Sequence, residues 1–513
     1  MRFIVSPKFF QNIFDKLLIM VAFSTAFYSF SYITADPDLW GHIRFGKELF
    51  EAKSFLYSDI FSYTAYGHEW VNHEWLSELF MFCIFNVFGS IGLLIMKMLV
   101  GLAIVYILFI ISRYREKSSL MWTMVSMIAV MIMGPGFMIR PQLVTLLFTA
   151  LFFFVFHLYL ERDTNRLWLL PLIMIIWVNS HGGFIIGAGL LPVVVICVLG
   201  ENVFKGNYKN REKKIIVWSI LTEISILVNP YGVRILTFLF ESLSVPRDIT
   251  EWNPITILDF SFLKFKIFSL LVLSFIFLNR GKNRYWEIGI ILIAMVFSFM
   301  HQRHSPILAI VATPFLTENL SKVSKKIKLD NIIYSVSSYG ILIFVLCILI
   351  GYQLSTTMNR YVKSGFNIIV DPNFFPVYAI QFLRDNKLTG NILVPFVWGE
   401  YAIWKLYPEC KVSIDGRFRT VYPEEIIDDH FAALRSERNW MKLINKYPPD
   451  IILSKRNMIS KKMINANPDW IYVYSDDISI IFIKDEKYHQ WITDKKGGGK
   501  IIYPKRSLSI YFP

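Results

Sequence analysis

Two carboxylates, Asp36 and Asp38, stand two residues apart directly after an apolar run, and His42 follows Asp38 within about one helical turn. Such a pair of acids can hold a divalent cation. Alternatively, one acid can act as a general base while the other orients it. The sequence therefore predicts an acid site at this position, with either Asp36 or Asp38 as the base.

Further candidates lie at the ends of later apolar segments, on the side that the loop charges predict to be outside. Arginine suits phosphate oxygens because its planar fork donates two hydrogen bonds at once. An ionised group at membrane depth is costly, so it usually faces a cavity or a partner. Acids together with arginines predict a phosphate-bearing lipid substrate. The candidate binding residues are His42, His73, Glu74, Arg140, His181, His301 and Arg303.

Each candidate also has a purely structural explanation. Interfacial His and Arg side chains commonly extend to the lipid headgroups. The sequence Asp36-Pro37-Asp38 can form a helix-capping turn, because Asp suits a cap position and Pro the first helical position. The convergence of several such residues, from segments far apart in the sequence, favours a shared site.

Composition indicates that the elements carrying these residues are membrane helices. Of 513 residues, 54% are apolar and 18% are charged, whereas soluble domains average about 45–50% and 25%. The four cysteines are too few and too scattered for a disulfide scaffold or a zinc site. The net charge of +14 raises nucleic-acid binding as a function. However, Lys and Arg concentrate in alternate loops, as the positive-inside rule predicts, so we expect no nucleic-acid partner.

A spanning helix needs about 20 mostly apolar residues. The apolar runs predict a polytopic α-helical membrane protein with about 11 spans and a cytoplasmic N-terminus. Residues 35–75 form the first outer loop, and 76–88 form a short helix that ends at Gly89-Ser90. The predicted spans are 17–34, 91–112, 119–137, 142–160, 167–179, 184–203, 215–229, 263–279, 285–300, 305–319 and 331–353.

The chain divides into a predicted transmembrane domain, 1–353, and an extracytoplasmic α/β domain, 354–513. In the second domain, short runs rich in β-branched residues alternate with helical patterns at 376–386 and 424–436, which predicts a small, largely parallel sheet. The strand candidates are 391–394, 411–414, 450–453, 471–474 and 478–483.

Several motifs together carry a family resemblance over nearly the whole chain. They are Asp36-Pro37-Asp38-Leu39-Trp40-Gly41-His42, Phe61-Ser62-Tyr63-Thr64, Trp70-Val71-Asn72-His73-Glu74-Trp75-Leu76, Arg140-Pro141-Gln142, Asn179-Ser180-His181-Gly182-Gly183-Phe184, Asn229-Pro230-Tyr231-Gly232 and Ile414-Asp415-Gly416-Arg417. With the long first outer loop, they resemble the GT-C superfamily of membrane glycosyltransferases, and most closely a poorly characterised bacterial branch. Gly41 departs from that pattern, which has a second Trp at this position.

The resemblance implies a glycosyltransferase that uses a polyprenyl-phosphate-linked sugar and keeps its catalytic acid, here Asp36 or Asp38, in the first outer loop. The acceptor would be a glycan, lipid or protein of the cell envelope, at the outer face of the cytoplasmic membrane. Mg²⁺ or Mn²⁺ is compatible with the acids but not required. The alternative is a non-catalytic scaffold for envelope polymer assembly, which would use two motifs as a docking surface, Trp398-Gly399-Glu400-Tyr401 and Asp415-Gly416-Arg417.

Overall fold

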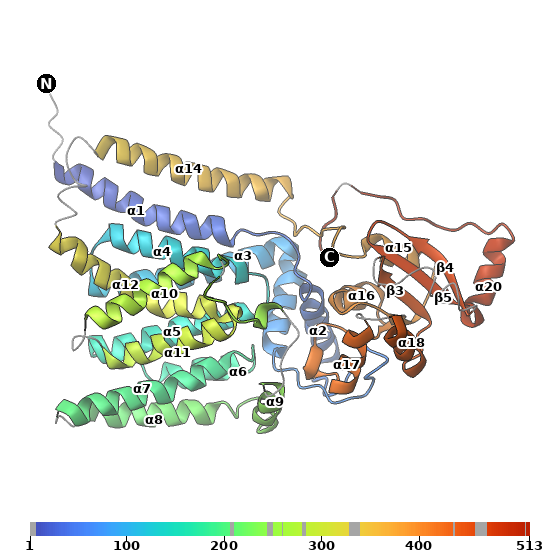
Figure 1. Ribbon diagram of the computed structural model, residues 1–513, viewed down its shortest axis with the longest axis horizontal. Helices are drawn as coiled ribbons and strands as arrows, with labels where there is room; N and C mark the ends of the chain where they lie inside the picture. The colour runs from blue at the N-terminus through green and yellow to red at the C-terminus, as the bar shows by residue number, and fades with distance from the viewer. Residues whose placement is uncertain are drawn as a thin grey trace. The chain divides into compact units, whose positions relative to one another are not determined.

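The computed structural model forms two compact units (Figure 1). The first comprises residues 1–32, 93–232 and 245–366, and the second comprises 33–92, 233–244 and 367–513. The predicted span 331–353 and the basic loop at 205–214 lie partly outside the described residues. The structure describes residues 7–205, 210–243, 250–258, 260–279, 284–327, 339–433, 437–456, 469–507 and 509–513.

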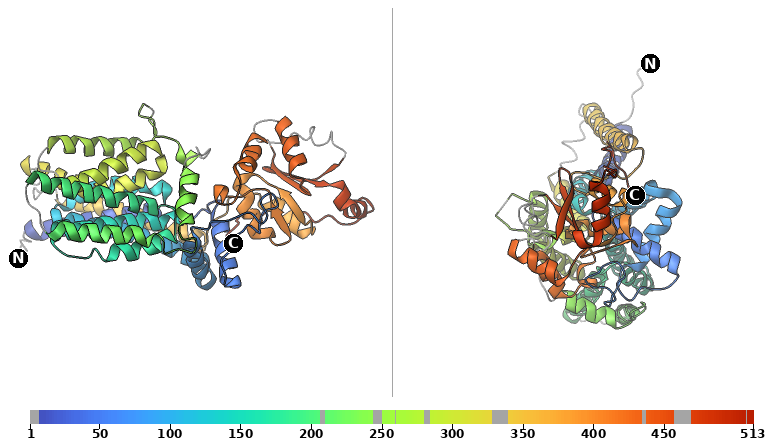
Figure 2. Two further views of the ribbon diagram at one scale, coloured as in Figure 1. Left: turned by 90° about the horizontal axis from the view of Figure 1, so that it is seen from below. Right: turned by 90° about the vertical axis from the view of Figure 1, so that its right-hand side faces the viewer.

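The first unit is a bundle of helices that run side by side (Figures 1 and 2). Three short 3₁₀ helices, η1 (Gly134–Gly136), η2 (Thr250–Trp252) and η3 (Gln302–His304), lie in its connections. The α-helices are α1 (Pro7–Phe30), the later part of α3 (Trp75–Arg115), α4 (Ser119–Met133), α5 (Gln142–Arg162), α6 (Leu169–Val178), α7 (Phe184–Lys205), α8 (Asn210–Ser225), α10 (Leu263–Leu278), α11 (Tyr285–Met300), α12 (Ser305–Lys326) and α14 (Tyr339–Lys363).

Length and composition make many of these helices suitable for a bilayer. Among the described residues, six helical segments are long and apolar enough to cross a membrane, and α6 and α11 are shorter apolar helices. The predicted helical membrane architecture is therefore confirmed, while the count of about 11 crossings stays a prediction. The six segments are Phe9–Phe30, Trp75–Arg115, Ser119–Gly136, Gln142–Arg162, Phe184–Glu201 and Gly340–Lys363.

Helix α3 contains the break that the sequence predicts. Gly89 has non-helical backbone angles, φ 61° and ψ −154°, which glycine adopts readily because it has no Cβ. The predicted short helix 76–88 and the predicted span 91–112 are thus the two arms of one interrupted helix. The two compact units divide three residues further on, between Gly92 and Leu93.

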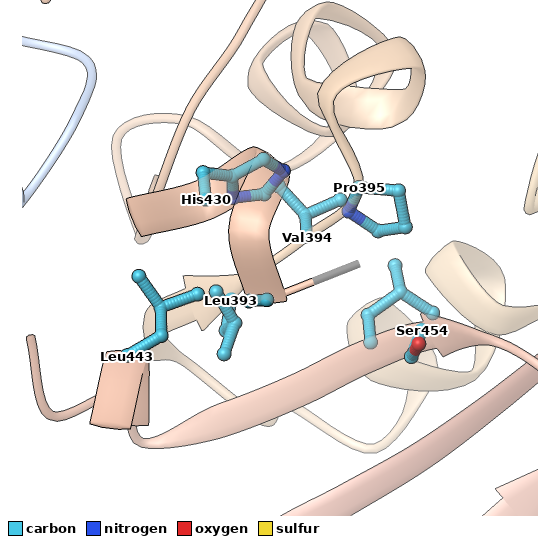
Figure 3. Close-up of a pocket in the computed structure, with 8 residues that line it drawn as sticks. Leu393, Val394, Pro395, His430, Leu443 and Ser454 are labelled. Carbon is cyan, nitrogen blue, oxygen red and sulfur yellow. The ribbon is translucent and has the colours of Figure 1, made fainter. Parts of the chain in front are cut away.

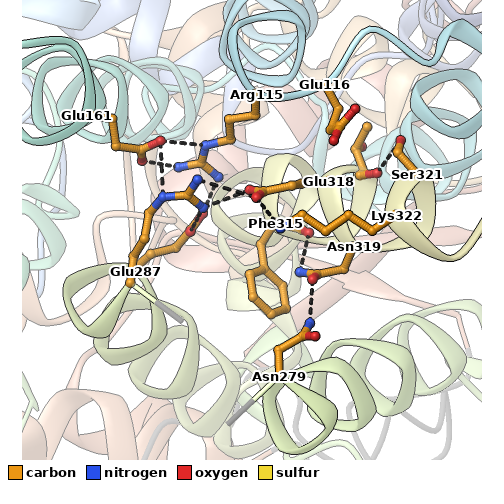
Figure 4. A network of polar contacts seen from close by, with 12 residues as sticks. Arg115, Glu116, Glu161, Asn279, Glu287, Phe315, Glu318, Asn319, Ser321 and Lys322 are labelled. Carbon is orange, nitrogen blue, oxygen red and sulfur yellow. Dashed lines mark hydrogen bonds and ion pairs between the residues drawn. The ribbon is translucent and has the colours of Figure 1, made fainter. Parts of the chain in front are cut away.

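Buried ion pairs join four helices of the first unit at one end of the bundle (Figure 4). Arg115 Nη1 on α3 lies 2.5 Å from Glu287 Oε1 on α11, and its Nε donates to Glu161 Oε2 on α5 at 3.0 Å. Arg284 links Glu161 at 3.2 Å to Glu318 of α12 at 2.7 Å. The side chains of Arg115 and Glu287 are 2% and 1% exposed. Charges this deeply buried are tolerated only when paired.

Replacing Arg115 by methionine should therefore destabilise the first unit. The Arg115→Met variant removes one of the two arginines that pair with Glu161 and Glu287 and leaves only Arg284 beside them. Breaking a buried ion pair in this way typically costs about 3–5 kcal/mol. Thermal unfolding of the purified protein in detergent measures the effect. Arg113→Met is the matched control, because Arg113 donates a hydrogen bond to an exposed backbone carbonyl, that of Lys117, and not to a buried carboxylate of this network (Figure 4). Equal melting temperatures for the two variants would contradict the role of the network.

The second unit is built around a five-stranded sheet with the order β2-β1-β3-β5-β4. Its strands are β1 (Gly390–Leu393), β2 (Cys410–Val412), β3 (Ile451–Lys455), β4 (Trp470–Ser475) and β5 (Ser479–Lys484). Its helices are α2 (Leu39–Ala52), the first arm of α3, α9 (Arg234–Leu243), α15 (Val377–Asp385), α16 (Gly399–Leu406), α17 (Glu424–Ala433), α18 (Glu437–Lys446) and α20 (Asp485–Lys496), with the 3₁₀ helices η4 (Phe396–Trp398) and η5 (Phe418–Thr420).

The sheet is mixed, so the prediction of a largely parallel sheet is wrong for its second half. Strand β1 pairs in parallel with β2 and β3, whereas β5 pairs antiparallel with β3 and β4. The reason lies in the short link between β4 and β5. The carboxylate of Asp476 accepts the backbone N–H groups of Ile478 and Ser479, which makes a tight turn, and a tight turn can join only antiparallel strands.

Helices α17 and α18 bury one face of the sheet. Ala433 of α17 and Leu443 of α18 pack against inward-facing strand residues such as Leu393, Ile452 and Phe482. Helix α15 contacts β4 and β5, with the ring of Phe382 stacked 4.7 Å from that of Tyr474. The predicted α/β character of the C-terminal region is confirmed.

Backbone hydrogen bonds connect the first predicted outer loop to the C-terminal region. The N–H of Ala35 donates to Ile369 at 2.8 Å, and Tyr63 and Val412 join the loop to the edge of β2, with Tyr63 N–H donating at 3.0 Å. Residues 33–92 and 367–513 consequently belong to one compact unit. The predicted boundary at 353 falls inside α14, which continues to Lys363. The division of the chain into a transmembrane and an extracytoplasmic domain stays a prediction.

Candidate functional site

The two predicted catalytic acids precede α2 in the second unit. Asp36 is buried, and its Oδ1 accepts the N–H of Asp38 at 3.1 Å. Asp38 occupies the N-cap position of α2, yet its side chain makes no capping hydrogen bond to the helix. The capping-turn explanation therefore places Asp38 correctly at the N-cap, but its side chain does not make the capping hydrogen bond. The carboxylates of Asp36 and Asp38 lie in one turn, as an acid site requires.

One turn further along α2, His42 meets two carboxylates at the start of α3. Its Nδ1 lies 3.3 Å from Glu78 Oε1 and 3.9 Å from Glu74 Oε2. Asn72 Nδ2 donates to the other oxygen of Glu78 at 2.6 Å. Burial by itself lowers the pKa of His42, but the hydrogen bond to Glu78 and the charges of Glu74 and Glu78 outweigh it and raise that pKa above its ordinary value.

His42, Glu74 and Glu78 have the donor atoms of a cation site. One donor atom from each of these three side chains lies within 4.8 Å of the other two, and no other such group is found among the described residues. One imidazole nitrogen with two carboxylates suits Mn²⁺ or Zn²⁺ better than Mg²⁺, which prefers oxygen alone. His73 is not part of the group; its Nε2 lies 3.8 Å from Glu74, and its ring packs beside Phe238.

A third carboxyl group reaches this region from the C-terminal part of the same unit. Glu400 of α16 is buried, and its Oε2 accepts the N–H of Gly41 at 3.1 Å. Burial raises the pKa of Glu400 well above its ordinary value, and the nearby carboxylates of Asp38 and Asp415 raise it further. Glu400 therefore keeps its proton to a higher pH than an exposed glutamate would.

Arg417 ties the first predicted outer loop to the C-terminal region. Its Nη2 bonds Asp415 Oδ2 at 2.7 Å, and its Nη1 bonds Asp59 Oδ1 at 2.7 Å. The guanidinium lies about 5 Å from the rings of Phe45 and Trp70. Despite its burial, these acids raise the pKa of Arg417 well above its ordinary value, so the group stays charged.

The burial of these motifs contradicts the docking surface expected for the scaffold alternative. Trp398, Glu400, Asp415 and Arg417 are 1%, 4%, 0% and 7% exposed. They pack inside the second unit because the arginine and the acids need one another away from water. The prediction of an exposed docking surface made from these two motifs is wrong.

The remaining predicted residues lie in the first unit. Arg140 lies 3.6 Å from Glu251 of η2, and Arg303 stacks 4.8 Å from the ring of Trp252 in the same short helix. His301 Nδ1 donates to the Trp252 carbonyl at 2.8 Å. Arg140, His301 and Arg303 thus gather around η2. Their binding role stays a prediction.

His181, also in the first unit, makes hydrogen bonds to nearby residues of α5 and of the turn before α7. Its Nδ1 lies 2.8 Å from Thr145 Oγ1 of α5 and 2.9 Å from the N–H of Gly183. The structure therefore divides the predicted residues between the two units, and His181 is not among those that gather around η2. Those of the second unit are Asp36, Asp38, His42, His73 and Glu74, and those of the first unit are Arg140, His181, His301 and Arg303.

A cavity in the α/β part offers no comparable chemistry. It measures ≈ 10 Å³ and is lined mainly by apolar residues at the carboxyl ends of β1 and β3, together with His430 and Ser454 (Figure 3). Such a volume holds about one water molecule. Burial lowers the pKa of His430 to about 4, so its imidazole is neutral at neutral pH. The acid cluster of the second unit is the stronger candidate site.

Sequence patterns missed three acids of this cluster. Glu78 lies four residues after Glu74, and that helical spacing could have indicated a shared face. Asp59 precedes the Phe61-Ser62-Tyr63-Thr64 motif, and Glu400 follows Trp398-Gly399, but neither has a local signal for its partner. Their contacts, Asp59 with Arg417 and Glu400 with Gly41, span more than 350 residues of sequence.

Comparison with known proteins bears on the fold. No family model matches the sequence, and no curated protein matches it. Among solved structures, the apo form of the Archaeoglobus fulgidus oligosaccharyltransferase matches 91% of this chain and 74% of that chain, with 11% identity and a TM-score of 0.60. The complex of AglB from Archaeoglobus fulgidus with an inhibitory peptide and a dolichol-phosphate matches 86% of this chain and 69% of that chain, at 12% identity and a TM-score of 0.57.

The chain has the GT-C fold. The structural similarity extends over both compact units. Because the sequence identity is low, the similarity establishes the fold and not the activity. Apo ArnT from Cupriavidus metallidurans matches 91% of this chain and 97% of that chain at 12% identity, with a TM-score of 0.49. The matches to the two Archaeoglobus fulgidus structures confirm the predicted GT-C-like fold class, polytopic helices followed by an α/β region.

The raised pKa of Glu400 predicts a pH dependence of stability. Its pKa in the folded protein exceeds the unfolded value of about 4.3. The stabilisation is therefore complete below that value and is lost as the pH rises through the folded pKa. Melting temperatures from pH 5 to 9 should fall more steeply for the wild type than for Glu400→Gln, which has no proton to lose. The charged groups that act on Glu400 are Asp38, Asp415, Arg417 and Glu78. Parallel curves would contradict the raised pKa.

Proposed function

We propose that the protein is a membrane glycosyltransferase that moves a sugar from a polyprenyl-phosphate-linked donor to an envelope glycan, lipid or protein. The observation that carries the proposal is the cluster of acids at the start of α2, on a chain with the GT-C fold. One structure with this fold, AglB, is in complex with a dolichol-phosphate, which supports a lipid phosphate as donor here. The bias of Lys and Arg supports a reaction at the outer face of the cytoplasmic membrane.

The transfer is an inverting displacement. The acceptor hydroxyl attacks the anomeric carbon, the new C–O bond forms as the bond to the lipid phosphate breaks, and the polyprenyl phosphate departs with the electron pair. The acceptor proton passes to the carboxylate of Asp38 or Asp36. The hydrogen bond from Asp38 N–H to Asp36 Oδ1 keeps the two acids in one turn. A phosphate is already a good leaving group, so the mechanism assigns no separate acid.

Arg140 and Arg303 are the proposed ligands of the donor phosphate. Both lie around η2, Arg140 beside Glu251 and Arg303 over Trp252. A bidentate guanidinium matches phosphate oxygens better than a lysine does. The neighbouring His301, bonded to the Trp252 carbonyl, would help to fix η2, and His181 would order the start of α7.

A divalent cation, if the enzyme uses one, would bind to His42, Glu74 and Glu78. A bound cation would supply positive charge beside the acids and the reacting phosphate. Of the expected ions, Mn²⁺ fits the mixed nitrogen and oxygen donors better than Mg²⁺. The roles of Asp36 and Asp38 in proton transfer do not depend on the ion.

Replacing the catalytic acid should abolish transfer without unfolding the protein. Asp38→Asn, or Asp36→Asn if that residue is the base, should lower the rate by about 10²–10⁴-fold. The assay reconstitutes purified protein in liposomes with a panel of polyprenyl-phosphate sugars and membrane extract, and follows the release of polyprenyl phosphate. Asp477→Asn, at a 72% exposed side chain, is the matched control. Normal transfer by the folded Asp36→Asn, Asp38→Asn double variant would refute the assignment.

Metal binding can be measured apart from catalysis. Wild-type protein titrated with Mn²⁺ should show one binding site, and Glu78→Gln should weaken it by at least tenfold. Tenfold is the minimum loss that we expect, because replacing a residue that only hydrogen-bonds to a metal ligand already lowers metal affinity by about 10–100-fold. Glu51→Gln, at a side chain that is 57% exposed, should bind Mn²⁺ like the wild type. If the wild type does not bind Mn²⁺, the proposed metal site is wrong, while the proposed role of Asp36 and Asp38 is unaffected.

A further inference from the structure

The N-terminus of α2 is capped by a different helix. The first amides of any α-helix lack partners within the helix, and an Asp at the N-cap normally accepts one of them. Asp38 holds that position without making the bond. Instead, the N–H of Gly41, in the first turn, donates to Glu400 Oε2 at 3.1 Å. Glu400 itself belongs to the first turn of α16, which packs against α2 within the second unit.

Two glycines make room for this carboxyl group. A Cβ at Gly41 would lie 2.2 Å from Glu400 Oε2, so a side chain at that position would have to displace the carboxyl group of Glu400. A Cβ at Gly416 would lie 2.3 Å from Glu400 Oε1 and 3.0 Å from Asp38 Oδ1. The carboxyl groups of Glu400 and Asp38 therefore approach the same glycine. Where the resembled family has a Trp, this chain has Gly41, and the carboxyl group of Glu400 occupies the space that a side chain there would need.

We infer that Glu400 is a positioning residue for Asp38: it caps α2 from α16, so that the helix does not recruit the carboxylate of its own N-cap residue. The inference rests on the proposed function, because it concerns the direction of a carboxylate proposed to act on the acceptor. Without Glu400, the amide of Gly41 would lose its acceptor, and Asp38 is the residue that an unsatisfied N-terminus would normally use. A carboxylate turned toward the helix can no longer reach the acceptor hydroxyl.

The conservative replacement for Glu400 is glutamine. The raised pKa of Glu400 favours its acid form, with a carbonyl oxygen as acceptor, over a wider pH range than in an exposed glutamate. A glutamine amide presents the same carbonyl oxygen at nearly the same length. Glu400→Gln therefore keeps the cap, whereas Glu400→Ala removes it. Gly416→Ala displaces the carboxyl group while leaving Glu400 in the chain, which gives a second way to break the cap.

Two measurements on the full-length protein test the inference. Hydrogen–deuterium exchange over residues 36–46 reports the cap, and the transfer assay reports the direction of Asp38. We expect faster exchange in Glu400→Ala and Gly416→Ala, and wild-type exchange in Glu400→Gln. We expect Glu400→Ala to lower kcat by about 10²-fold, the cost of misplacing a reacting group by about 1 Å, with little change in KM. Glu400→Gln should recover at least tenfold of that loss.

The outcomes separate failure of the inference from failure of the proposed function. Asp38→Asn is the control, because it should stop transfer while leaving the exchange of α2 unchanged. Faster exchange in Glu400→Ala, with no transfer by any variant or by the wild type, supports the cap and counts against the proposed reaction. Unchanged exchange in both Glu400→Ala and Gly416→Ala overturns the inference. Equal losses of kcat in the Ala and Gln variants also overturn it, because the carbonyl acceptor would then be irrelevant.

Discussion

The candidate site depends on the ion pairs that Arg417 makes with Asp59 and Asp415. A guanidinium that is almost completely buried is tolerated only with its charge matched and its donors satisfied. Here Asp415 is its neighbour in the chain, while Asp59 comes from the first predicted outer loop. The pairing therefore fixes that loop, with Asp36, Asp38 and His42, to the C-terminal α/β region. Removing the Arg417 side chain would leave both buried carboxylates without this cation, which is strongly destabilising.

Much of the fold could be predicted from the sequence because its signals are local. Apolar length located α1, α4, α5 and α7 to within a few residues of the predicted spans, apart from a longer N-terminal start of α1. The glycine at 89 marked the break in α3 because a positive φ suits glycine. The direction of strand pairing was harder, since it depends on how long each connection is. The short turn at Asp476, which has no strong signal in the apolar pattern, makes β4 and β5 antiparallel.

The site was only partly predictable, for a related reason. Asp36, Asp38, His42 and Glu74 stand in one loop with a recognisable motif, so a local pattern could indicate them. Glu400 joins them across 359 positions of sequence, and no local spacing contains that information. The departure at Gly41 was visible in the sequence as a missing aromatic residue. Its cause, a carboxyl group lying where the side chain would start, required the packing of α2 against α16.

The α/β region therefore has a part in the chemistry proposed for the first loop. A separate docking module would expose its polar motifs, but this region buries Glu400, Asp415 and Arg417 against the loop that carries the acids. Ion pairing and a raised pKa explain how so many carboxyl groups can share a small buried volume. The charge of Arg417 offsets part of the negative charge of Asp59 and Asp415, and the raised pKa of Glu400 favours its neutral form beside Asp38. The carboxylate of Asp38, which the proposed mechanism uses as a base, thus lies beside acids that pair with Arg417 or hold their proton more tightly than usual.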